Sequence, residues 1–125
     1  MKKIIMVDDE ADQIYTMKTL LEDHSNEYEL IGVENGKKCL QLLKNGQLPD
    51  LIFLDIMMPQ ISGWELFESI KKNPEWKHIP IVFLTARTDE VAVNAGKFLG
   101  DGFINKPYNA DEILQVIKEK TERKK

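Results

Sequence analysis

Four short apolar runs in this chain each lead to a polar residue. They are residues 4–7 before Asp8 and Asp9, 51–54 before Asp55, 81–84 before Thr85, and 103–104, which lead through Asn105 to Lys106. Apolar runs of this length, separated by stretches with helical periodicity, predict buried parallel strands. The carboxyl ends of parallel strands lie along one edge of their sheet. The pattern therefore predicts that carboxylates, a hydroxyl and an ammonium group meet in one shallow pocket.

Length and charge limit the classes of protein to which the chain can belong. Its 125 residues fit a single domain, residues 1–125, with residues 121–125 as a frayed basic end. The net charge of −4 disfavours nucleic-acid binding. No apolar run is long enough to insert into a membrane, and the start of the chain lacks the pattern of a secretory signal, so we expect a cytoplasmic protein. Cys39 is the single cysteine, which excludes an internal disulfide.

Strand-like and helix-like segments alternate along the chain, which predicts an α/β fold. We expect strands near residues 3–7, 28–33, 51–54, 81–84 and 103–105, and helices near 11–24, 36–46, 63–72, 89–99 and 109–121. Asn109 and Glu112 have the spacing of a capping box at the start of the last helix. Right-handed crossovers favour a doubly wound, five-stranded parallel sheet in the order 2-1-3-4-5, with the five helices on both faces.

In that strand order, the polar residues at the strand ends have a clear chemical task. Clustered carboxylates repel one another, so the cluster of Asp8, Asp9 and Asp55 is expected either to raise the pKa of a carboxylate or to hold a cation. Oxygen ligands without His or Cys favour Mg²⁺, with Mn²⁺ as a second possibility. An oxygen of Asp55 that the metal leaves free could then attack phosphorus and form an aspartyl phosphate. Thr85 and Lys106 would contact the charged phosphoryl oxygens.

Several motifs make the chain similar to the receiver domains of response regulators in two-component signalling, especially the single-domain chemotaxis type. The motifs that carry this resemblance are residues 7–10, residues 55–59 with Gly63, residues 84–86 and residues 106–108. The resemblance extends from about residue 3 to residue 120. Each motif alone is a weak signal, whereas their joint order and spacing are specific.

The resemblance implies a flavodoxin-like fold and a role for each matched residue. Asp55 would be the phosphoacceptor. Asp8, Asp9 and Asp55, together with the backbone carbonyl of Met57, would surround Mg²⁺. Two further matches, Thr85 and Phe103, would form the switch that carries the signal.

The function implied is a phosphorylation-activated signalling switch. The domain would accept a phosphoryl group, in a Mg²⁺-dependent reaction, from a sensor histidine kinase or a histidine phosphotransfer protein. It would then change its affinity for a downstream protein partner at the face formed by helix 89–99, strand 103–105 and helix 109–121. Beyond phosphorylating and dephosphorylating itself, the domain would not be an enzyme.

Alternative functions remain open at this point. The domain could be an intermediate in a phosphorelay or, less favoured, a phosphohydrolase that forms an aspartyl phosphate. Such a hydrolase usually needs a second acid and a substrate cap, and the sequence indicates neither. A nucleotide or flavin binder is disfavoured because no glycine-rich phosphate loop follows the first strand.

Overall fold

The computed structural model describes residues 1–55, 63–85, 102–106 and 108–122, with the backbone only of Trp64 and Thr85. Its five strands form one parallel sheet in the order β2-β1-β3-β4-β5, which confirms the predicted topology. The strands are β1 (Lys2–Val7), β2 (Tyr28–Val33), β3 (Leu51–Asp55), β4 (Ile81–Thr85) and β5 (Phe103–Asn105). β1 lies between β2 and β3, so the winding of the chain reverses beside β1.

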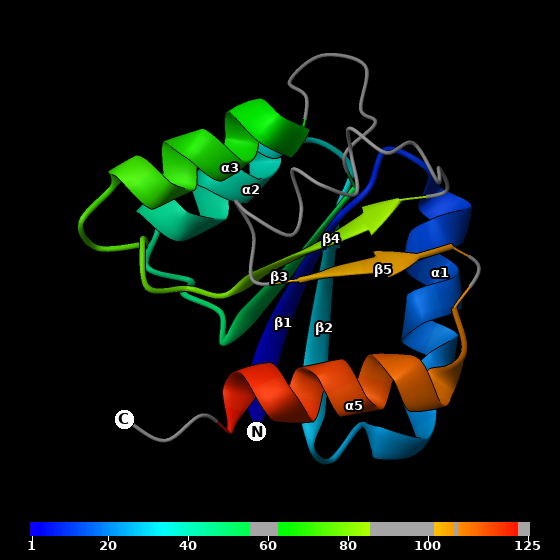
Figure 1. Cartoon of the computed structure of the whole chain (residues 1–125). Coiled ribbons are helices and arrows are strands. Elements are labelled where there is room, and N and C mark those ends of the chain that lie inside the picture. Colours follow the sequence, from blue (N-terminus) through cyan, green and yellow to red (C-terminus); the bar gives the residue numbers. More distant parts are fainter. Residues whose placement is uncertain (56–62, 86–101, 107, 123–125) are drawn as a thin grey trace.

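In the described residues, helices follow β1, β2, β3 and β5 and cover both faces of the sheet (Figure 1). They are α1 (Ala11–Leu20), the short 3-10 helix η1 (Glu22–His24), α2 (Gly36–Lys44), α3 (Gly63–Lys72) and α5 (Ala110–Thr121). The first helix was expected to continue to residue 24. It ends earlier, because the hydrogen bond from the His24 amide to the Leu21 carbonyl belongs to a tighter turn. The helix expected at residues 89–99 lies outside the described residues.

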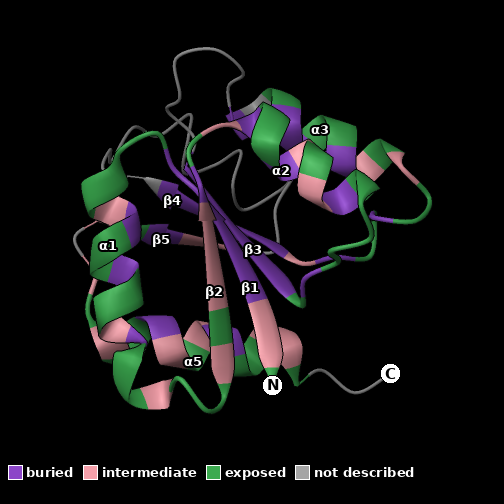
Figure 2. Ribbon diagram, turned by 180° about the vertical axis from the view of Figure 1, so that it is seen from behind, coloured by how far each residue is buried: buried purple, intermediate pink, exposed green. Residues whose placement is uncertain are grey.

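Two apolar clusters, one on each face of the sheet, form the core. Successive strand residues point to opposite faces, so Ile5 and Val7 join one cluster whereas Ile4 and Met6 join the other. The first cluster packs against α2 and α3, and the second against α1 and α5. Buried residues are continuous through the central strands, as Figure 2 shows. This continuous burial explains why the runs in β1, β3 and β4 are apolar rather than alternating.

Gly32 in β2 allows α1 to pack close to the sheet. A Cβ atom at this position would collide with the side chain of Ile14 on α1. Gly32 pairs with Met6 of β1, in the register that aligns Val33 with Val7. Close packing of α1 therefore depends on a glycine here, and it holds the start of that helix beside the end of β1.

α5 is capped at both ends. The Asn109 side chain accepts from the Glu112 amide at 2.8 Å, and the Glu112 side chain accepts from the Asn109 amide, which confirms the predicted capping box. At the other end, Lys2 Nζ donates to the Thr121 carbonyl at 2.8 Å and to the Thr121 hydroxyl at 3.0 Å. A cation at a helix C-terminus is favourable. These contacts tie α5 to the first residues of β1.

Candidate functional site

Two buried carboxylates lie side by side at the carboxyl end of the sheet. Asp8 directly follows β1 and is 0% exposed, and Asp55 ends β3 and is 5% exposed. Val7 pairs with Leu54, so the residues that follow this pair, Asp8 and Asp55, occupy neighbouring positions at the same edge. Within the described part of the chain, no other charged or polar residue is buried. Ionised groups are rarely left in the interior without partners, so this pair marks the edge as a site.

Lys106 brings an ammonium group to both carboxylates. Its Nζ donates a hydrogen bond to Asp8 Oδ2 at 2.9 Å and lies 3.7 Å from Asp55 Oδ2. The Lys106 side chain is only 11% exposed. Its ammonium therefore balances part of the negative charge where water screens that charge poorly. The sequence predicted Lys106 in this pocket, but only the structure shows that its shortest contact is with Asp8.

Three successive carboxylates form an oxygen-rich cluster beside this ion pair. Asp8, Asp9 and Glu10 each offer an oxygen that lies within 4.8 Å of the other two. Asp9 and Glu10 are exposed, and the Glu10 amide donates to Asp8 Oδ1 at 2.9 Å. These hard oxygen ligands, at the mouth of a partly open site, fit Mg²⁺ or Mn²⁺. Sequence reasoning gives Glu10 no role in the site, although three acidic residues in a row are a visible signal.

Two of the remaining residues expected at the site, Thr85 and Phe103, lie on β4 and β5. Thr85 ends β4, where its backbone pairs with Asn105 of β5, and its side chain is outside the described part. Met57 also lies outside it. Phe103 begins β5 opposite Phe83 and is half-buried against the cluster that contains α2 and α3.

Tyr108, a residue to which sequence reasoning gave no role, also belongs to the surroundings of this site. Its hydroxyl is buried and has no hydrogen-bond partner. Burial, followed by the negative charge of Asp8, raises the pKa of the Tyr108 phenol from 10.0 to about 12. The sequence signal for Tyr108 is its place in the motif at residues 106–108, which carries the resemblance without assigning this residue a role.

Comparison with known protein families shows to which family a chain with this fold and this cluster of site residues belongs. Residues 4–118 match the model of the response regulator receiver domain. The chain belongs to this family. The match covers all the described site residues, and it favours neither a phosphohydrolase nor a nucleotide binder.

Similar proteins agree with this assignment along almost the whole receiver domain. The polar-differentiation response regulator DivK of Brucella anthropi is 31% identical over 120 residues, which are 94% of each chain. A solved receiver domain of a signal transduction histidine kinase from Syntrophus aciditrophicus has a TM-score of 0.85 and 29% identity, and the match covers 98% of this chain and 91% of that one. The solved Mn²⁺-bound form of response regulator Rcp1 has a TM-score of 0.78 and 28% identity, over 95% and 91% of the two chains.

Other relatives are much longer than this chain. The chain spans 8% to 46% of the length of four further curated relatives, among them histidine kinase P4 of Formosa agariphila. The activities in such names therefore do not pass to this receiver domain. None of the helices in the described residues is long and apolar enough to cross a membrane.

Proposed function

We propose that this receiver domain accepts a phosphoryl group on Asp55 from a phosphohistidine of a sensor histidine kinase or a histidine phosphotransfer protein. The observation that supports this most strongly is the burial of Asp55 at the end of β3, beside Asp8 and within ion-pair distance of Lys106. A buried carboxylate at a sheet edge that already carries an ammonium group is well placed to act as a nucleophile toward phosphorus. An Asp55 oxygen forms the new bond to phosphorus. The bond from phosphorus to the histidine nitrogen breaks, and that nitrogen keeps the electron pair.

The residues around Asp55 supply positioning and charge in this reaction. The Lys106 ammonium neutralises oxygens of the transferred group, and the Thr85 hydroxyl contacts another of them. Transfer of this kind needs little covalent help, so placing positive charge next to the phosphoryl oxygens accounts for most of the acceleration. Asp8, Asp9 and Asp55, with the Met57 carbonyl, would hold Mg²⁺ or Mn²⁺. When bound, such an ion offsets the negative charge that the carboxylates and the phosphoryl group bring together.

Support for the metal site comes from the donor set. Asp8, Asp9 and Glu10 present only oxygen, and two of the three are exposed, so a hydrated ion could be bound with several of its waters retained. The Mn²⁺-bound form of the similar Rcp1 is consistent with this assignment.

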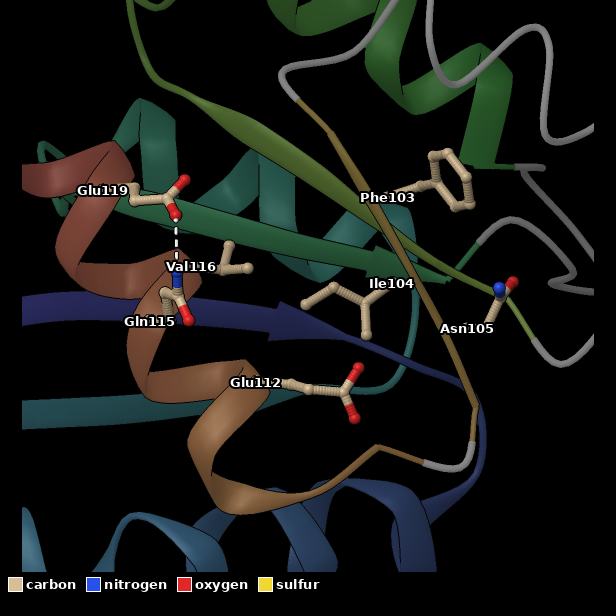
Figure 3. A pocket seen from close by; sticks show the side chains of 7 residues that line it. All are labelled: Phe103, Ile104, Asn105, Glu112, Gln115, Val116 and Glu119. Atoms are coloured by element: carbon tan, nitrogen blue, oxygen red, sulfur yellow. Dashed lines mark hydrogen bonds between the residues drawn. The ribbon is translucent and has the colours of Figure 1, made fainter.

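The signal leaves the domain, in this proposal, at the face that includes β5 and α5. An open pocket of about 370 Å³ lies between these two elements. Figure 3 shows Ile104 and Val116 facing one another there, with Glu112 and Glu119 on α5. Phe103 projects from β5 on the side away from α5, toward the cluster that it contacts.

Phe103 and Thr85 are the two switch residues of this proposal. A Thr85 hydroxyl drawn toward the phosphoryl group would leave room that the Phe103 ring could fill, and this would change the partner face beside β5. The effect is a shift between two populated states, and a downstream protein partner that prefers one state reads it.

The test is mass spectrometry after incubation with acetyl phosphate and Mg²⁺. Wild type should gain one phosphoryl group, and Asp55→Asn should gain none while remaining folded by circular dichroism. Asp50→Asn is the matched control, because Asp50 directly precedes β3 and Asp55 ends the same strand. Normal labelling of Asp55→Asn, or its loss in Asp50→Asn, would contradict the assignment.

A further inference from the structure

The pocket between β5 and α5 combines apolar side chains with two exposed carboxylates. Its lining includes Ile104, which is 6% exposed, and Val116, which is partly buried against the cluster of α1 and α5. Glu112 and Glu119 are exposed and line the same pocket, as Figure 3 shows. They are seven residues apart, so they occupy one face of α5 about 10 Å from each other along its axis. Val116 therefore lies on the same face, between the two charges.

Neither carboxylate has a cationic partner among the residues that the structure describes. Glu112 accepts from the Asn109 amide at 3.3 Å. Glu119 accepts from the Gln115 side chain at 3.2 Å. Both donors are neutral, and no lysine, arginine or histidine of the described part lines the pocket. The described residues thus leave two negative charges uncompensated beside an apolar surface.

We infer that this pocket binds a protein partner through an apolar side chain flanked by two basic side chains. The inference rests on the output face proposed above and adds the chemistry of its partner. The apolar side chain covers Ile104 and Val116, and the basic ones pair with Glu112 and Glu119. Complementary charge around an apolar contact selects the partner and speeds association more than it adds affinity.

Charge disfavours a second copy of this chain as the occupant. In a symmetric dimer the same surface meets itself, so Glu112 and Glu119 of both copies would face one another. The net charge of −4 adds to this repulsion. A basic partner relieves the repulsion between the two carboxylates, whereas a second copy increases it.

Conservative substitutions remove the charges and keep the helix. Glu112→Gln keeps an oxygen that accepts from the Asn109 amide, because glutamine also serves in a capping box. Glu119→Gln likewise keeps an acceptor at its position. The matched control is the double variant Asp111→Asn, Glu122→Gln, which removes two exposed carboxylates at the ends of α5 that do not line the pocket.

The measurement is an NMR titration of the unphosphorylated full chain with two synthetic helical peptides. One peptide carries two lysines two helical turns apart with a leucine midway between them, and the other carries glutamates in place of the lysines. The lysine peptide should shift the amide signals of residues 103–105 and 112–119, and the glutamate peptide should bind more weakly. The double variant Glu112→Gln, Glu119→Gln should bind the lysine peptide about fivefold more weakly and lose most of the salt dependence of wild type. The control variant should bind like wild type.

Each other outcome rejects a particular statement. Equal binding of the two peptides, or no shift at the pocket, would overturn the inference. An equal loss in the control variant would also overturn it, because general attraction to an acidic protein would then explain the binding. Signals of the pocket that shift with protein concentration, without peptide, would assign the pocket to a second copy instead.

Labelling by acetyl phosphate tests the proposed function separately. It should persist in the double variant Glu112→Gln, Glu119→Gln, because neither residue lies among the groups around Asp55. Failure of wild type to label would contradict the phosphoacceptor role of Asp55, whereas the peptide titration would still decide the charge preference of the pocket.

Discussion

Charged groups are exposed to solvent, at least in part, at the amino end of the sheet, whereas two of them are buried at its carboxyl end. At the amino end, Lys2 bonds to Thr121, Lys3 Nζ donates to Gln47 at 2.9 Å, and the Lys3 amide donates to Asp50 at 2.8 Å. These groups are partly or fully exposed. At the carboxyl end, Asp8 and Asp55 are buried around Lys106, with Asp9 and Glu10 beside them. The amino end holds elements together, whereas the carboxyl end concentrates negative charge that favours a cation.

The largest expected effect is a loss of stability when the ammonium group of Lys106 is removed from the carboxyl end of the sheet. Lys106→Met should lower the free energy of unfolding by about 3 kcal/mol, because one partner of a buried ion pair is lost and its carboxylates remain buried. Urea denaturation at pH 7 without divalent ions measures this, and added Mg²⁺ should reduce the difference. A loss below about 1 kcal/mol would mean that the ion pairs of Lys106 contribute no more to stability than exposed ion pairs do.

The next largest effect is expected on metal binding at the carboxyl end of the sheet. Asp9→Ala should weaken Mg²⁺ binding at least about tenfold, because a direct ligand matters at least as much as a residue that supports one. Isothermal titration measures the affinity. The control is Asp12→Ala, which removes the same charge from the first turn of α1. If both variants lost affinity equally, general attraction to the acidic region would explain the binding and a specific site would not.

A smaller effect is expected at the amino end. Lys2→Met should lower the free energy of unfolding by about 1 kcal/mol, because it removes two hydrogen bonds at the end of α5 that water can partly replace. Mg²⁺ affinity should stay at the wild-type value. A change in Mg²⁺ affinity in this variant would show that the two ends of the sheet are coupled.

The smallest effect concerns the ionisation of two tyrosines, one near each end. Burial raises the pKa of both Tyr28 and Tyr108, and Asp8 contributes only to that of Tyr108. Asp8→Asn should therefore lower the pKa of Tyr108 and leave that of Tyr28 unchanged, as measured by alkaline titration of phenolate absorbance. The raised pKa of Tyr108 favours the folded state in full below pH 10, and this contribution is lost as the pH rises toward 12. Equal shifts in both tyrosines would rule out a local effect of Asp8.

Some features of this receiver domain follow from the sequence alone. Apolar runs that end in Asp8, Asp55 and Thr85 predicted the strands, their order and the edge at which polar residues meet, because strand burial and crossover handedness leave few alternatives. The capping box of α5 was equally visible, since its residues are three apart. The helix at residues 89–99, the Met57 carbonyl and the contacts of the Thr85 side chain stay predictions.

Tertiary structure alone decided the contacts between residues far apart in the chain. The bond from Lys106 to Asp8 joins residues 98 positions apart, and that from Lys2 to Thr121 joins residues 119 apart. The space beside Gly32 depends on where Ile14 lies, and the unpaired hydroxyl of Tyr108 depends on what surrounds its ring. Hydrophobic periodicity shows which face of an element is buried, but strand register and side-chain length decide which atoms come within hydrogen-bond distance.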